Sequence, residues 1–149
     1  MKPLLPGHVL VCPIRSVPRY CGLTSAETID LFLTVRQISR MIERVYKATS
    51  LNIAIQDGPD AGQSVPHVHV HIIPRMKRDL EDRGGSDAIY AMMDGEEGDL
   101  GRQLAERDGG ERKREWNGPD MQGREARSVD AMKEEADMLR REMEAEAEE

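Results

Sequence analysis

The positions of apolar residues in the first half of the chain predict three β-strands. Residues 7–12 form an apolar, β-branched run that Pro13 ends. Residues 51–56 alternate loosely between apolar and polar side chains, and residues 67–73 alternate strictly, with a period of two. Because proline lacks the backbone N–H that a strand donates, we expect the third strand to stop at Pro74.

A long helix is predicted between the first two strands. Thr24 and Glu27 have the spacing of a capping box, in which the Thr24 hydroxyl accepts from the Glu27 N–H and the Glu27 carboxylate reaches back. The apolar residues that follow recur mainly every three or four positions, which indicates a helix with one face in a core. We expect this face to contain Ile29, Phe32, Leu33, Ile38, Met41, Ile42 and Val45.

Charged residues dominate the second half of the chain. The first 76 residues contain 8 Lys and Arg and 5 Asp and Glu, a net charge of +3, whereas the last 73 contain 13 and 23, a net charge of -10. We therefore predict a folded core over residues 1–76 and a charged, mostly disordered insertion over residues 77–119. Residues 120–149 are predicted to form an amphipathic helix with an acidic end, its apolar stripe being Val129, Met132, Ala136, Leu139 and Met143.

Composition and charge exclude several classes of protein. No apolar run approaches the roughly 20 residues that span a bilayer, and Pro6 and His8 interrupt any signal-peptide core. An isoelectric point near 5.2 excludes an overall basic nucleic-acid-binding surface. The two cysteines, Cys12 and Cys21, are too few for a disulfide framework, so we expect reduced thiols and a location in the cytoplasm or nucleus.

Three of the four histidines in the chain lie within five residues. His67, His69 and His71 occupy alternate positions of the third predicted strand, so their side chains share one face, while Val68, Val70 and Ile72 face the core. Neighbouring histidines on a strand are about 6.6 Å apart, which suits an extended anion such as a polyphosphate better than one metal ion. We therefore predict no metal bound by the protein itself.

A row of imidazoles near neutral pH can perform phosphoryl chemistry. A neutral imidazole can attack phosphorus to form a phosphoramidate, and its neighbours can orient it, donate to non-bridging oxygens or protonate the leaving oxygen. The segment just upstream, from Gly62 through Gln63 and Ser64 to Val65, offers backbone N–H groups as an anion nest.

These motifs resemble the histidine-triad (HIT) family, whose signature alternates three histidines with apolar residues. Residues 67–73 fit every position of the signature, and residues 62–65 fit the run that precedes it. Residues 6–13, 56–59 and 74–75 resemble the fragile-histidine-triad branch, whose members hydrolyse diadenosine triphosphate. The resemblance implies an α+β fold, a HIT-like antiparallel sheet with one long helix and a C-terminal helix, and a HIT domain core in residues 1–76.

The resemblance also implies a role for each histidine. His69 matches the nucleophile that forms a covalent AMP–histidine intermediate, and His71 matches a contact to the substrate phosphates. His67 matches a residue that orients its neighbours through backbone hydrogen bonds, and His8 matches a supporting histidine. The positions that match substrate-binding residues are Gln56, Gly62, Gln63, Ser64, Val65 and His71.

The branch further implies a homodimer built on the long helix and a shared sheet, and a substrate that carries Mg²⁺ or Mn²⁺. The expected partner is a dinucleoside polyphosphate, with no nucleic acid and no membrane. The branch normally has two strands before the segment matched by residues 6–13, so we expect an N-terminally truncated chain without that hairpin.

Two other functions are compatible with the residues. One is an adenosine phosphoramidase, which shares the histidine motif. The other is a nucleotide-binding or signalling module that is catalytically impaired because part of the base pocket is missing.

Overall fold

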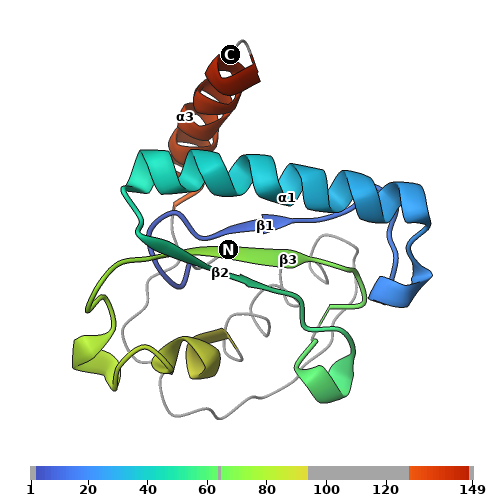
Figure 1. The fold of residues 1–149 in the computed structure, drawn as a ribbon, viewed down its shortest axis with the longest axis horizontal. Coiled ribbons are helices and arrows are strands. Elements are labelled where there is room, and N and C mark those ends of the chain that lie inside the picture. Colours follow the sequence, from blue (N-terminus) through green and yellow to red (C-terminus); the bar gives the residue numbers. More distant parts are fainter. Residues whose placement is uncertain (1–2, 64, 94–127, 148–149) are drawn as a thin grey trace.

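The fold is organised around one antiparallel sheet of three strands. The computed structural model describes residues 3–63, 65–93 and 128–147. The strand order is β1-β3-β2, so β3 lies in the centre. A long helix covers one face of this sheet (Figure 1). The strands and main helices are β1 (Val9–Val11), α1 (Ser25–Tyr46), β2 (Ser50–Ala54), β3 (Val70–Arg75) and α3 (Val129–Ala147), with short 3-10 turns at Tyr20–Gly22, Pro59–Ala61 and Glu81–Arg83.

The central strand begins later than the sequence predicts, at Val70. It also ends later, at Arg75, and therefore includes Pro74. The Thr49 N–H donates to the Arg75 carbonyl at 3.0 Å, so Arg75 bonds on the β2 side. Because backbone groups alternate in direction along a strand, an N–H at Pro74 would point toward β1. The pairing of β1 with β3 extends only to Val9 opposite Ile72. The missing N–H of Pro74 therefore leaves no ladder partner unpaired, and the expectation that Pro74 ends the strand is wrong.

Helix α1 begins at the predicted capping box. The Thr24 side chain accepts from the Glu27 N–H, and the Glu27 carboxylate accepts from the Thr24 N–H at 2.8 Å. Hydrogen bonds from Arg15, and then from the Thr24 N–H, lower the pKa of Glu27 to about 2. The helix ends at Lys47, which adopts a left-handed conformation with φ of 55°.

The buried face of α1 differs from the predicted one at its N-terminal half. Met41 and Ile42 are buried as expected, but Leu31 and Val35 are buried in place of Ile29, Phe32 and Leu33. Ile38, also predicted on this face, is partly buried against the same core. The side chains of Ile29, Phe32 and Leu33 are 61%, 43% and 60% exposed. The helix therefore carries a second apolar face that does not contact the sheet.

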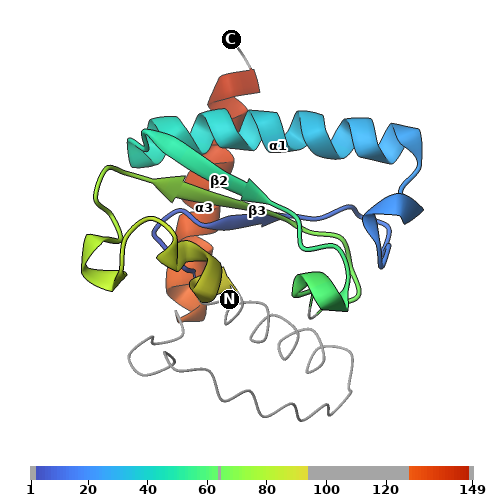
Figure 2. The same ribbon diagram turned by 60° about the horizontal axis from the view of Figure 1, so that its bottom comes forward.

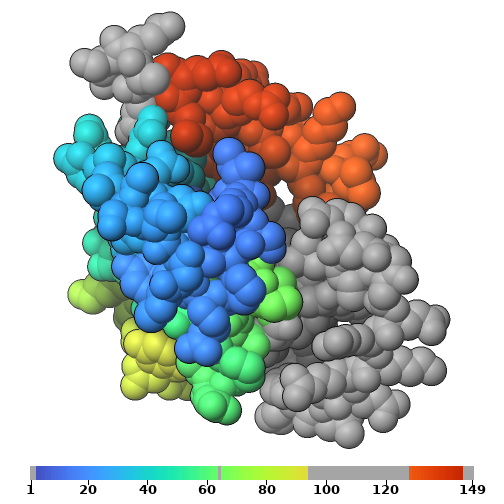
Figure 3. All heavy atoms as spheres, turned by 90° about the vertical axis from the view of Figure 1, so that its right-hand side faces the viewer, coloured from blue at the N-terminus to red at the C-terminus, as the bar shows by residue number. Residues whose placement is uncertain are grey.

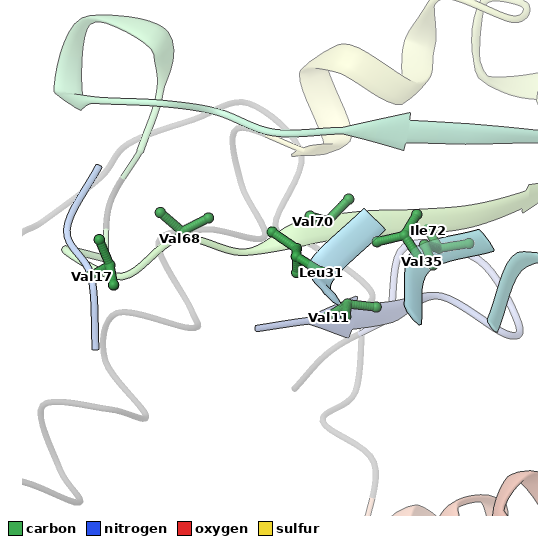
Figure 4. Packing of buried hydrophobic residues seen from close by; sticks show 7 residues of the cluster. All are labelled: Val11, Val17, Leu31, Val35, Val68, Val70 and Ile72. Carbon is green, nitrogen blue, oxygen red and sulfur yellow. The ribbon is translucent and has the colours of Figure 1, made fainter. Parts of the chain in front are cut away.

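The core between α1 and the sheet contains the residues that alternate with the histidines. Val68, Val70 and Ile72 pack with Val11, Val17, Leu31 and Val35 (Figure 4). Each of the first three is at most 1% exposed. The predicted division of this segment into a core face and a histidine face is confirmed.

Residues 77–93 cover the opposite face of the sheet. Leu80, Ile89 and Met93 form a second buried cluster with Ile73 of β3 and Leu4. Residues 88–93 are helical and lie on the side of the sheet away from α1 (Figure 2). The structure thus differs from the disorder expected for residues 77–93, whereas residues 94–119 lie outside the described residues.

A buried ion pair fixes this segment to the sheet. Arg75 donates to both carboxylate oxygens of Asp79, at 2.7 and 2.9 Å, and to Oδ1 of Asn52 on β2 at 2.6 Å. The side chains of Arg75 and Asp79 are only 10% and 11% exposed. Hydrogen bonding from Arg75 lowers the pKa of Asp79.

Helix α3 packs on the C-terminal half of α1 (Figure 1). The Tyr46 hydroxyl donates to Glu135 at 2.6 Å, and Arg44 pairs with Glu142. The helix lies within residues 120–149, where the sequence predicts it, and residues 120–127 are outside the described residues.

We predict that Ser39→Ala raises the free energy of unfolding. The Ser39 hydroxyl is buried in α1 and has no hydrogen-bond partner among the described residues. Removing an unsatisfied buried hydroxyl should stabilise the fold by about 1–2 kcal/mol, measured by urea denaturation. Gln37→Ala, at an exposed position of the same helix, is the control for helix propensity and should change stability by less than about 0.5 kcal/mol. An unchanged or lower stability of Ser39→Ala would contradict the prediction.

We predict that Asp79→Asn lowers the free energy of unfolding by about 2–3 kcal/mol at pH 7, because it leaves the Arg75 charge buried without a carboxylate. A carboxyl whose pKa is lowered by folding stabilises above its unfolded value of about 3.9 and loses this contribution as pH falls. The difference between wild type and variant should therefore shrink in denaturation curves below about pH 4.

The Arg78–Glu81 pair in the same segment provides the matched control. Its side chains are 70% and 56% exposed, so Glu81→Gln should cost less than about 1 kcal/mol. If both substitutions changed the free energy of unfolding equally, the buried Arg75–Asp79 pair would stabilise the fold no more than an exposed pair.

Candidate active site

Three of the four histidines, His8, His69 and His71, contact one another through their rings, and His71 lies on the face of β3 opposite α1. Only His71 belongs to β3, because the ladder starts at Val70. His67 and His69 precede it in irregular backbone, so the predicted strand over residues 67–73 is wrong at its start. Val68 nevertheless donates its N–H to the Val17 carbonyl at 2.7 Å and stays in the core. The two histidines beside it therefore keep the alternation of a strand.

The ring of His69 is held by the backbone of the preceding histidine. Its Nδ1 lies 2.8 Å from the His67 carbonyl oxygen, and His69 is 2% exposed. A carbonyl oxygen only accepts hydrogen bonds, so Nδ1 carries the proton. In the neutral ring Nε2 then has the lone pair, and it is the nitrogen that can act as a nucleophile.

His67 has the opposite tautomer. The Val17 N–H donates to Nδ1 of His67 at 3.3 Å, and a backbone N–H can only donate. In the neutral ring the proton is therefore on Nε2, which is a donor. His67 is partly exposed, unlike the other three histidines.

His8, His71 and His69 form a contiguous row. Nε2 of His8 lies 3.0 Å from Nδ1 of His71, and their ring centroids are 5.3 Å apart. The His71 and His69 rings meet edge to face, with centroids 5.1 Å apart. His8 is 3% exposed and His71 is fully buried. The His69 and His71 rings are thus closer to each other than the about 6.6 Å that separates alternate residues of an ideal strand.

The Gln63 side chain braces the loops around these histidines. Its Oε1 accepts from the Gly58 N–H at 2.8 Å, and its Nε2 donates to the Pro18 carbonyl at 2.9 Å and to the His67 carbonyl at 3.4 Å. The loop before α1 and residues around 58–67 accordingly lie side by side (Figure 3). Gln63 thus stabilises the same carbonyl that orients His69.

The other predicted substrate-binding residues differ in conformation and burial. Gly62 has a φ of 92° and ends the 3-10 turn of Pro59–Ala61. Val65 is 5% exposed, Gln56 follows β2 and is partly buried, and Ser64 lies outside the described residues.

Asp57 adds a second connection that the sequence alone did not indicate. Hydrogen bonds from Arg19, and then from the Tyr20 N–H at 2.7 Å, lower the pKa of its carboxyl. The backbone groups of Val17 and Leu4 that contact histidines were also missed. Every residue except proline supplies an N–H, so no side-chain pattern identifies these donors.

The described residues contain no group of three His, Cys, Asp or Glu side chains placed to hold a metal ion. Among the helices that the structure describes, none has the length and apolar character required to cross a membrane.

Comparisons with known proteins point to one family. The family model "HIT domain" matches residues 1–78 of the 149-residue chain. A bis(5'-nucleosyl)-tetraphosphatase [asymmetrical] of Schizosaccharomyces pombe is 54% identical over 100 residues, which are 67% of this chain and 53% of that protein. A bifunctional bis(5'-adenosyl)-triphosphatase/adenylylsulfatase FHIT of Arabidopsis thaliana is 51% identical over 104 residues, 70% of this chain and 56% of its own length.

A solved structure shows the same fold. The diadenosine triphosphate hydrolase of Plasmodium falciparum, in complex with Cyclomarin A, is 37% identical with a TM-score of 0.52, covering 71% of this chain and 67% of that one. The chain spans about half the length of the curated relatives it matches. With the family model matched over more than half of its residues and the histidine row in place, the chain belongs to the HIT-domain family.

Proposed function

We propose that the protein hydrolyses diadenosine triphosphate to AMP and ADP, with His69 as the nucleophile. The observation that carries this proposal is the hydrogen bond from His69 Nδ1 to the His67 carbonyl, which makes Nε2 the unprotonated nitrogen. Relatives 51–54% identical are named as hydrolases of dinucleoside polyphosphates, which supports the same substrate class.

The reaction has two displacements at the α-phosphorus. Nε2 of His69 attacks phosphorus, the bond to the bridging oxygen breaks, and ADP leaves. Water then attacks the phosphoramidate, AMP is released, and the lone pair returns to Nε2. His67, with its proton on Nε2, would donate to phosphate oxygens, and His71, whose ring contacts that of His69, would be a second contact to them. Mg²⁺ or Mn²⁺ enters with the substrate and neutralises part of its charge.

We also propose that the protein acts as a homodimer. The exposed apolar face of α1, formed by Ile29, Phe32 and Leu33, lies beside an edge of the sheet. Phe32 packs edge to face on Tyr20, whose N–H bonds to Asp57 just after the edge strand β2.

The edge strand continues the same apolar surface. Ile53 is 49% exposed and pairs with Ile72, so both side chains lie on the α1 side of the sheet. β2 is an edge of the described sheet, and an edge can pair with its twofold copy.

The free thiols of Cys12 and Cys21 fit the cytoplasmic or nuclear location that the sequence predicts.

We predict that His69→Asn lowers turnover of diadenosine triphosphate at least about a thousandfold. The Asn side chain can still donate to the His67 carbonyl but has no nitrogen at the position of Nε2, so the change is confined to the nucleophile. Separation of AMP and ADP after incubation with substrate and Mg²⁺ measures turnover, and an alkaline quench followed by mass spectrometry detects AMP on His69 of the wild type.

The outcomes separate the alternatives. Turnover by His69→Asn equal to wild type would overturn the mechanism. Faster cleavage of adenosine phosphoramidate than of the dinucleotide would favour the phosphoramidase. Tight binding of a slowly hydrolysed analogue by calorimetry, without product, would favour a binding module.

We predict that Leu33→Glu dissociates the dimer, because it places a charge in the apolar face of α1 and should weaken association at least about a hundredfold. Sedimentation velocity measures the change. Ile14→Glu is the matched control, because Ile14 is fully exposed and outside this face. A wild-type monomer, or equal effects of both substitutions, would contradict the proposed interface.

A further inference from the structure

A tight turn brings the backbone of Leu4 back to the ring of His8. The backbone N–H of His8 donates to the Leu5 carbonyl at 3.1 Å, and Gly7 has a φ of 82°. Pro6 followed by a glycine with positive φ is typical of a type II turn. The turn places the Leu4 N–H 3.2 Å from Nδ1 of His8, which is buried.

The protein holds this turn from two sides. A Cβ on Gly7 would lie only 2.7–2.8 Å from the Tyr46 ring at the end of α1, so the glycine backbone rests directly on that ring. On the other side the Leu4 side chain is 4% exposed and packs with Leu80, Ile89 and Met93. The Leu4 amide is therefore fixed by parts of the chain that are far apart in sequence.

The direction of the hydrogen bond from the Leu4 N–H determines which ring nitrogens of His8 and His71 carry a proton. A backbone N–H can only donate, so Nδ1 of His8 must accept and the proton of the neutral His8 ring is on Nε2. Nε2 of His8 then donates to Nδ1 of His71 across 3.0 Å. His71 in turn has its proton on Nε2.

We propose that the Leu4 N–H is a positioning group that sets the tautomers of His8 and His71. The result is a pair of neighbouring rings with opposite tautomers: Nε2 of His71 is a donor, while Nε2 of His69 is an acceptor. A phosphate bound beside them would meet a nucleophile and a hydrogen-bond donor that are already in their reactive forms. This catalytic consequence depends on the proposed function, whereas the tautomers do not.

The experiment replaces one N–H by oxygen. Cys12 allows a synthetic thioester of residues 1–11 to be ligated to expressed residues 12–149, which restores the full chain. In one protein the Leu4 amide becomes an ester, which removes the N–H and keeps the side chain. The control has the ester at Leu5, whose N–H makes no hydrogen bond among the described residues. A second control is the ligated all-amide chain.

The readout is the ring-nitrogen NMR spectrum of ¹⁵N-labelled histidines at about pH 8, above the ordinary histidine pKa. In the all-amide protein we expect His8 and His71 to be protonated at Nε2 and His69 at Nδ1. The Leu4 ester should shift the tautomer ratio of His8 and His71 about five- to tenfold, the effect of one ordinary hydrogen bond, and leave His69 unchanged. The Leu5 ester should change none of them.

Unchanged tautomers in the Leu4 ester, or equal shifts in both esters, would overturn the proposal. Turnover of diadenosine triphosphate is measured on the same samples, and we expect a five- to tenfold loss with the Leu4 ester alone. If the Leu4 ester shifts the tautomers but the all-amide protein produces no AMP, the proposed hydrolase activity would be overturned. The positioning role of the Leu4 N–H would still be supported.

Discussion

The burial of β3 on both faces is the constraint on which the rest of the structure depends. One face packs on Leu31 and Val35 of α1, and the other packs under Leu80 and Ile89. A histidine in such a strand is removed from water, and each ring nitrogen that loses water must find a hydrogen-bond partner or incur the cost of desolvation. The same packing that stabilises the sheet therefore buries His71 and lets its hydrogen bond with His8, rather than water, decide its tautomer.

The irregular backbone before β3 gives His69 its particular role. Because the ladder begins at Val70, the His67 carbonyl bonds to the side chains of His69 and Gln63. In a regular strand each carbonyl is directed at a neighbouring strand. The departure from strand geometry thus supplies the acceptor that leaves a lone pair on Nε2 of His69. Core alternation is kept through this departure because Val68 remains anchored to Val17.

The sequence predicts what depends on local patterns and fails where distant contacts decide. The capping box at Thr24 and the alternation around His71 are local, and both are confirmed. The N-terminal half of α1 has two apolar faces, and periodicity alone cannot tell which one the sheet covers. The few large apolar residues among many charges suggested disorder for residues 77–93, but the Arg75–Asp79 pair fixes them to the sheet. The donors to Nδ1 of His8 and of His67 are backbone groups, which have no signature in the sequence.

The Arg75–Asp79 ion pair and the histidine row belong to one connected structure. Arg75 and His71 lie on the same face of β3, four residues apart. The ion pair of Arg75 holds the segment that carries Leu80, and Leu80 packs on Leu4, whose amide orients His8. Each contact in this series is a packed or hydrogen-bonded neighbour of the next, so residues 79–93 are connected to the Leu4 turn through the buried cluster that they share. The charged segment after the histidines therefore covers the face of β3 that carries His71, and its apolar residues pack with Leu4, whose amide donates to His8.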